Sequence, residues 1–137
     1  MDLFHSMNLA VSWGLLVLIW LVQIIIYPGF HRIPAEGFRR FHRWYTIRIA
    51  VIVIPLMAGE VMLTIAWIWS RPRFFPAWLA SVAVAAAWLS TFALQVPLHR
   101  RLRDGKRDAW IRRLVTTNWL RTLAWSVKAI AATAAAL

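Results

Sequence analysis

Four long apolar runs, at about residues 8–27, 46–69, 77–99 and 110–136, decide what this sequence can fold into. A helix needs roughly 20 mostly apolar residues to cross a bilayer whose hydrocarbon core is about 30 Å thick, and each run is long enough. The chain has 137 residues, so little of it is left for a soluble domain. We therefore expect an all-α integral membrane protein in which residues 1–137 form a single transmembrane four-helix bundle.

The composition agrees with this interpretation. Hydrophobic residues make up 61% of the chain and ten residues are tryptophan, which is too apolar for a soluble domain of this size. Only Asp2 and His5 precede the first run as polar ionisable residues, and no small-residue cleavage site follows it, so we expect a retained helix and not a signal peptide. The chain has no cysteine, which excludes disulfides and thiolate metal sites.

The net charge of +11 has a membrane explanation. Most of the arginines and lysines lie between the first and second runs, or between and beside the third and fourth, whereas the connection between the second and third runs has only Arg71 and Arg73. Positive residues favour the cytoplasmic side, so both basic loops are predicted there and both termini outside, in a bacterial cytoplasmic membrane. The basic rim favours anionic lipid headgroups as partners, and we expect no nucleic-acid binding.

Proline, glycine and aspartate mark the predicted ends of the helices. Tyr27–Gly29, with its central proline, is expected to end the first run, and Arg71, Pro72 and Arg73 to form the turn after the second. An Asp-Gly pair at 104–105 predicts the turn after the third run. Asp108 is then placed to cap the fourth helix through its carboxylate.

Polar side chains gather near the predicted cytoplasmic end of all four runs. Within the second, third and fourth runs they occur three or four residues apart, which places each pair on one helix face. Polar residues in a membrane bundle point inward and are hypotheses about a functional site. The predicted inner site consists of Gln23, His42, Tyr45, Arg48, Gln95, His99, Asn118 and Arg121.

A second polar layer is expected further out. Glu60 lies 18 residues after His42, and Lys128 lies 18 residues after Trp110, so both stand about 27 Å along their helices at 1.5 Å per residue. We predict that they form an outer ion pair, which Asn8 or Ser12 could join. This pair is either a structural salt bridge or a proton relay through Glu60, or else Lys128 snorkels toward the outer headgroups.

Histidines raise the question of a metal. His42 and His99 are candidate ligands for iron or copper, with His31 and Glu36 nearby, although no pair of ligands has metal-site spacing on one helix. Ligation of a haem by two imidazoles would also have to use His42 and His99, the only pair at a common depth. The alternative is that each histidine is a polar residue facing the headgroups.

Two motifs in the last third of the chain carry a resemblance. The sequence VPLHRRL at Val96–Leu102 and NWLRT at 118–122 resemble the small four-helix membrane proteins grouped with fungal anthrone oxygenases. Some members of that family oxidise polycyclic phenolic substrates with molecular oxygen. The resemblance therefore implies an oxygenase, or another redox activity, on an apolar small molecule. His99 stands where many members are expected to have asparagine.

Such an enzyme needs a base and groups that hold an anion. His99 or His42 would be the base, since imidazole titrates near neutral pH. Arg121 with Asn118 would stabilise the oxyanion in a dry pocket, and Tyr45 would orient the ring. The candidates for holding a cofactor are Gln23, Gln95 and Arg48.

Two other functions explain the same residues. A non-catalytic membrane scaffold or assembly factor would use the polar pairs to lock the helices together. A transporter of small molecules or ions would use Glu60 as its membrane carboxylate, although the strong charge bias of the loops is unlike that of dual-topology carriers. The alanine-rich faces of the third and fourth runs permit a homo-oligomer in each case.

Overall fold

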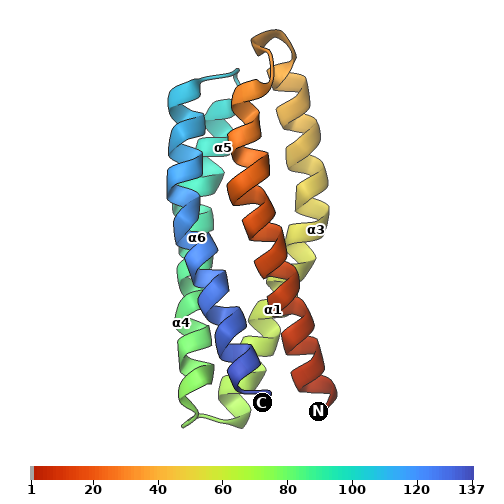
Figure 1. Ribbon diagram of the computed structural model, residues 1–137, viewed down its shortest axis with the longest axis vertical. Coiled ribbons are helices and arrows are strands. Elements are labelled where there is room, and N and C mark those ends of the chain that lie inside the picture. Colours follow the sequence, from red (N-terminus) through yellow and green to blue (C-terminus); the bar gives the residue numbers. More distant parts are fainter. Residues whose placement is uncertain (1) are drawn as a thin grey trace.

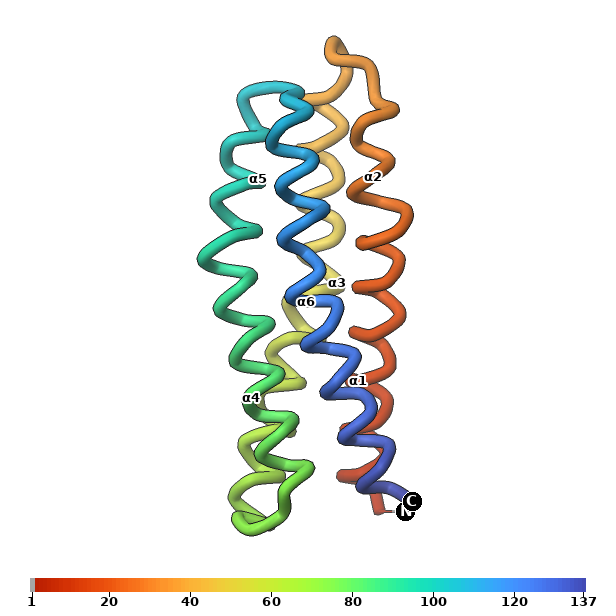
Figure 2. The backbone as a smooth tube through the Cα atoms, turned by 60° about the vertical axis from the view of Figure 1, so that its left-hand side comes forward, coloured from red at the N-terminus to blue at the C-terminus, as the bar shows by residue number. Residues whose placement is uncertain are grey.

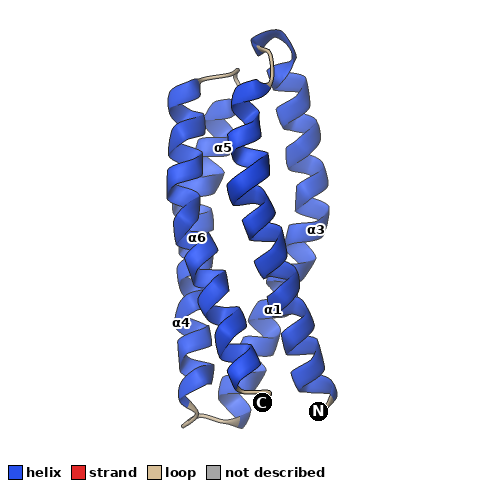
Figure 3. Ribbon diagram, viewed as in Figure 1, coloured by secondary structure: helices blue, strands red, loops and turns tan. Residues whose placement is uncertain are grey.

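The computed structural model describes residues 2–137, and these residues form an all-α four-helix bundle (Figures 1 and 3). The first helix comprises α1 (Leu3–Leu21), η1 (Val22–Ile26), α2 (Tyr27–Gly29) and η2 (Phe30–Arg32), and the second is α3 (Ala35–Ser70). The third comprises α4 (Phe75–Ser90), η3 (Thr91–Gln95) and α5 (Val96–Leu102), and the fourth is α6 (Asp108–Ala134). The predicted fold class is confirmed.

The distribution of polar and apolar side chains is that of a membrane protein. The helices spanning Leu3–Arg32, Ala35–Ser70 and Phe75–Leu102 are long and apolar enough to cross a bilayer. Large apolar side chains such as Val51, Leu89 and Ile130 are about two-thirds exposed on the outer surface. The interior, by contrast, buries eight amides and ionisable side chains and partly buries His99; the eight are Asn8, Gln23, His42, Glu60, Gln95, Asn118, Arg121 and Lys128.

The second helix begins eleven residues earlier than the predicted residue 46. Arginines at positions 39, 40 and 43 interrupt the apolar run, but they lie on the exposed side of α3. Phe38, His42 and Tyr45 lie on its buried side at helical spacing. The helix is amphipathic in its first three turns, so a search for continuous hydropathy misses them.

The first helix does not end at Tyr27–Gly29 as predicted, and continues to Arg32. Pro28 follows the π-helical turn η1, in which the Tyr27 N–H donates to the Val22 carbonyl five residues earlier. The third helix repeats this arrangement, since Pro97 follows η3 and the Val96 N–H donates to the Thr91 carbonyl. A proline lacks an N–H and its ring collides with the carbonyl four residues back, and a widened turn accommodates both effects.

Short turns join the helices at two ends of the bundle. One end carries residues 33–34 and 103–107, and we call it the basic end; the chain termini and the turn at residues 71–74 lie at the other (Figure 1). Gly105 has φ +147°, a conformation that favours glycine, which confirms the Asp-Gly turn. Asp108 is not the cap of α6 but lies in its first turn, after the extended residue Arg107.

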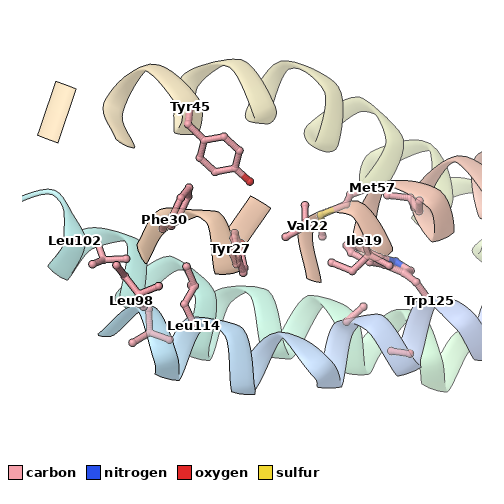
Figure 4. Close-up of a cluster of buried hydrophobic side chains, with 14 of the residues drawn as sticks. Ile19, Val22, Tyr27, Phe30, Tyr45, Met57, Leu98, Leu102, Leu114 and Trp125 are labelled. Atoms are coloured by element: carbon pink, nitrogen blue, oxygen red, sulfur yellow. The ribbon is translucent and has the colours of Figure 1, made fainter. Parts of the chain in front are cut away.

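Helix α6 lies at the centre of the packing, against both α4 and α1, and the tube in Figure 2 runs beside both. The larger buried cluster lies toward the basic end and includes Phe30, Leu98, Leu114 and Trp125 (Figure 4). Tyr45 projects from α3 toward α2 in this cluster (Figure 4). A smaller cluster around Trp67 closes the opposite end. A cavity lies beside the larger cluster, along α3.

Candidate functional site

A chain of hydrogen bonds joins three helices near the basic end. The hydroxyl of Tyr27 lies 3.0 Å from Nε2 of His99, and Nδ1 of His99 lies 2.9 Å from Nε2 of His42. Each imidazole donates at one nitrogen and accepts at the other when neutral, so both tautomeric directions of the chain are possible. A phenol and two imidazoles in series can therefore move a proton in either direction along the row.

A cavity of about 470 Å³ lies beside this chain, between α3 and the third helix. Tyr27 and His99 line it, together with the polar side chains of Tyr45 and Arg121. Its remaining wall is mostly apolar, formed by Val22, Ile49, Val53, Met57, Trp88 and others. Ile54 of α3 and Phe92 of η3 also line it and are exposed on the outer surface, so the cavity opens sideways between these helices.

Three polar atoms on the residues that line this cavity have no hydrogen-bond partner among the described residues. They are Nε of Arg121, Nε1 of Trp88 and Oε1 of Gln95. Buried polar atoms are nearly always hydrogen-bonded, and each unpaired one calls for an explanation. Two of these atoms are donors and one is an acceptor, which fits an apolar ligand carrying both an acceptor oxygen and a hydroxyl group.

The amides of the inner site belong to a separate network. Oε1 of Gln23 accepts from Nδ2 of Asn118 at 2.9 Å and from the hydroxyl of Thr122 at 3.1 Å. Nε2 of Gln23 donates to the carbonyl of Val115 at 3.1 Å. These three bonds join η1 to α6. Arg121 connects the network to the cavity, since its Nη1 donates weakly to Oδ1 of Asn118 at 3.4 Å.

Gln95 lies in η3 and donates from Nε2 to the hydroxyl of Thr117 on α6 at 3.0 Å. Gln23 and Gln95 thus occupy the two π-helical turns and reach α6 from either side. Arg48 does not join the group. It is exposed on α3, where its guanidinium lies 4.8 Å from the ring centre of Trp44, and Ile49 takes its place in the cavity wall.

The outer residues are buried at one level but do not form the predicted ion pair. Nζ of Lys128 donates to Oδ1 of Asn8 at 2.6 Å and to the hydroxyl of Ser12. Oε2 of Glu60 accepts from Nε1 of Trp125 at 2.9 Å, and its Oε1 has no partner in the part of the chain that is described. Salt bridges found within residues 2–137 do not include Glu60 with Lys128. Lys128 is buried and does not snorkel.

No three side chains of histidine, aspartate or glutamate within residues 2–137 gather closely enough to hold a metal ion. Two imidazoles that share a metal each stand about 2.0–2.1 Å from it, with the metal between their nitrogens. In this structure His42 and His99 instead form a direct hydrogen bond of 2.9 Å. The arrangement gives no support to the predicted metal or haem ligation by this pair.

His31 and Glu36 lie away from the inner site, at the rim. Nδ1 of His31 lies 2.8 Å from Oδ1 of Asp108, and this hydrogen bond lowers the pKa of the Asp108 carboxyl below its usual value of 3.8. Lys106 donates from Nζ to the backbone carbonyls of His31 and Ile33 at 2.7 and 2.9 Å. These contacts fasten the two basic loops to one another.

Tyr27 was expected only at the end of the first helix and was not among the predicted residues of the inner site. Its spacing of four residues from Gln23 was the available signal. Thr122, four residues after Asn118, was missed although the same rule applies. The apolar wall around Met57 and Trp88 has no sequence signal, because these residues look like lipid-facing ones. Comparisons of the chain with protein-family models, with curated proteins and with solved structures found no match.

Proposed function

We propose that this protein is a membrane enzyme that takes a proton from an apolar molecule bearing an acidic hydroxyl or an adjacent acidic carbon. The observation that supports it best is that the hydrogen-bonded row of Tyr27, His99 and His42 borders the same sideways-opening cavity as Arg121. An apolar substrate dissolved in the bilayer reaches such a cavity without crossing water. Small-molecule sites typically combine apolar walls with a few polar groups that fix orientation.

Tyr27 is the group that meets the substrate. Both ring nitrogens of His99 are engaged, Nε2 with Tyr27 and Nδ1 with His42, so His99 has no free lone pair to offer. The substrate gives its proton to the oxygen of Tyr27 while the Tyr27 proton passes to His99. His42 then receives the proton on the side of the basic end. His99 and His42 thus act through Tyr27.

Arg121 holds the anion that remains. Its guanidinium is buried, and its Nε–H has no protein partner among the described residues. Fixed donors in a site without water stabilise a developing oxyanion more strongly than water does. The Nε1–H of Trp88 supplies a second donor, and Oε1 of Gln95 accepts from a further hydroxyl of the substrate. Tyr45 lies against the ring of the substrate.

Molecular oxygen is the oxidant that the resemblance to anthrone oxygenases implies. After a ring CH₂ group loses its first proton, the carbanion transfers electrons to O₂ and a C–O bond forms. The resulting hydroperoxide loses water and leaves a carbonyl. The sum is CH₂ plus O₂ giving C=O plus H₂O, so the reaction needs no other reductant.

The orientation of the chain in the membrane is part of this proposal. The basic end faces the cytoplasm and the termini face outward, because the basic loops are short and carry most of the arginines. The cavity then lies in the cytoplasmic half of the membrane, and the proton leaves toward the cytoplasmic side. Four crossings require α6 to span as well, and its 27 residues extend about 40 Å.

The test uses a hydroxylated anthrone as the substrate and follows oxygen uptake and quinone absorbance with the protein in nanodiscs. The unchanged protein should accelerate oxidation above empty nanodiscs. Tyr27→Phe and His99→Gln should each lower the rate by about 10²-fold or more, as expected for the loss of general acid–base catalysis. His31→Gln is the matched control, since His31 lies at the rim, and it should keep the full rate. Equal rates for the unchanged protein and His99→Gln would remove the proposal.

A second candidate is a non-catalytic scaffold. The network of Gln23, Asn118 and Thr122 favours it, because the three hydrogen bonds of Gln23 lie inside the bundle and join η1 to α6. In that case the polar layer serves to fix the arrangement of the helices. A scaffold would not oxidise an anthrone, and substitution of these residues would lower only its stability.

A further inference from the structure

A second, larger cavity lies at the basic end, beside the first. It has a volume of about 790 Å³ and lies between the first turns of α3 and the end of α5. The residues that line it are Arg39, Arg40, His42, Arg43, Trp44, Thr46, Ile47, Arg103 and Asp104, and we call it the arginine cleft. On α3 these side chains recur three and four residues apart, so that one face of the helix presents three guanidinium groups.

The charge in the arginine cleft is unbalanced. Four arginines face a single carboxylate, that of Asp104, which leaves three positive charges in excess. None of the four arginines forms an ion pair with an acidic side chain within residues 2–137. Guanidinium groups match the oxygens of phosphate in a bidentate arrangement and are weakly hydrated. The cleft therefore has the donors for a phosphate group.

The arginine cleft adjoins the apolar cavity. Thr46 and Arg103 line both, so the two share a wall where α3 faces the end of α5. Beyond that wall the lining changes from guanidinium groups to apolar side chains such as Ile49 and Val53. A single molecule with a charged head and an apolar chain matches this change along its length.

We propose that the two adjoining cavities bind one anionic phospholipid, with its phosphate in the arginine cleft and an acyl chain in the apolar cavity. This goes beyond the proposed function, since it assigns a ligand to the cleft and requires no reaction. A bilayer lipid fits better than free phosphate for two reasons. The arginines are exposed and hold a lone anion weakly in water, and each methylene buried in the cavity strengthens binding by about fourfold.

The location of the cleft also favours a lipid. It lies at the end of three helices that are long and apolar enough to span a membrane, where headgroups are found. Trp44 and Ile47 add an apolar lining to the cleft itself. Trp44 is half-exposed, as is typical of tryptophans at the level of the headgroups.

Native mass spectrometry tests this proposal. The detergent-purified protein is mixed with equal amounts of dioleoyl phosphatidylglycerol and dioleoyl phosphatidylcholine, which differ in the charge of the headgroup but not in their chains. We expect the phosphatidylglycerol adduct to dominate. Each arginine near a lipid surface strengthens the binding of anionic lipid by about fivefold, so Arg43→Gln with Arg103→Gln should lower the preference by about 25-fold.

Matched variants distinguish lipid binding in the cleft from attraction by the overall charge of the rim. Arg112→Gln with Arg113→Gln removes the same charge from exposed positions on α6 that do not line the cleft, and should preserve the preference. Ala50→Leu narrows the apolar cavity and should weaken both lipid adducts alike. Lipid binding is measured on the unchanged protein without any anthrone present, so that a failure of the proposed chemistry stays distinct from a failure of lipid binding.

Three results would overturn the proposal. An equal loss of preference in the α6 control pair would show that only the overall charge of the rim matters. Displacement of phosphatidylglycerol by an equal concentration of inorganic phosphate would show that the cleft binds free anions. Unchanged adducts in Ala50→Leu would show that the acyl chain lies elsewhere.

Discussion

The bond network of Gln23 allows a quantitative prediction. The Gln23→Leu substitution keeps the size of the side chain and removes three hydrogen bonds between η1 and α6, those with Asn118, Thr122 and the Val115 carbonyl. Hydrogen bonds between membrane helices contribute about 0.6 kcal/mol each on average and about 1.7 kcal/mol at most. We therefore expect a loss of about 2 kcal/mol in the free energy of unfolding, with an upper bound of about 5 kcal/mol.

The control for this prediction is Gln95→Leu. Gln95 occupies the equivalent wide turn in the third helix but makes one side-chain hydrogen bond, to Thr117, so its loss should cost about 0.6 kcal/mol. Both variants are unfolded in bicelles by titration with sodium dodecyl sulfate, and helix content is followed by circular dichroism. A ratio near three between the two losses in unfolding free energy supports the view that each hydrogen bond contributes about equally.

Equal losses in the two variants would refute the reasoning. They would mean that the amides matter through their place in a widened turn, and not through the number of bonds each makes. A double-mutant cycle of Gln23→Leu with Asn118→Leu then isolates the single bond between these side chains, and a coupling energy near zero would contradict the hydrogen bond described above.

Three further predictions concern single residues. Glu60→Gln keeps an acceptor oxygen for Trp125 and should be at least as stable as the unchanged protein in thermal unfolding in detergent, whereas a loss above about 1 kcal/mol would mean that a charged carboxylate is needed near Lys128. Gly105→Ala should destabilise the bundle by about 1–3 kcal/mol, because its φ of +147° disfavours other residues although space for a side chain is open, and an unchanged melting temperature would contradict this. The lowered pKa of Asp108 means that its contact with His31 stabilises the fold above about pH 4 and is lost as the pH falls through the lowered value. NMR titration of the Asp108 carboxyl should show the lowered pKa, and His31→Ala should return it toward 3.8. An identical titration in both proteins would exclude the contact.

Hydropathy and turn residues were sufficient to predict four helices and the membrane character. Both follow from residue properties that act locally, such as the ability of Gly105 to adopt a φ of +147°. The same approach placed the second helix too late, since continuous hydropathy cannot detect a helix whose exposed side is basic. The spacing of Phe38, His42 and Tyr45 on the buried side contained the missing information.

Depth along the helices placed the polar residues of the candidate site at one level, but it could not choose their partners. Partners depend on how each helix is rotated about its axis, and hydropathy does not report rotation. Lys128 therefore meets Asn8 and Ser12 instead of Glu60, and Arg48 turns outward while Ile49 lines the cavity. The row through Tyr27 also required the relative rotation of three helices.

The two π-helical turns determine which residues meet at the basic end. A wide turn holds one residue more than an α-helical turn, and that residue rotates everything after it by about 100° around the helix axis. Tyr27 follows η1 and His99 follows η3, so both partners of the 3.0 Å hydrogen bond have been turned by the same amount. Deleting one residue from either wide turn would leave a continuous helix and yet turn one partner away from the other. In an alignment with related sequences, a one-residue gap within either wide turn would thus indicate that the relative lacks the hydrogen-bonded row of Tyr27, His99 and His42.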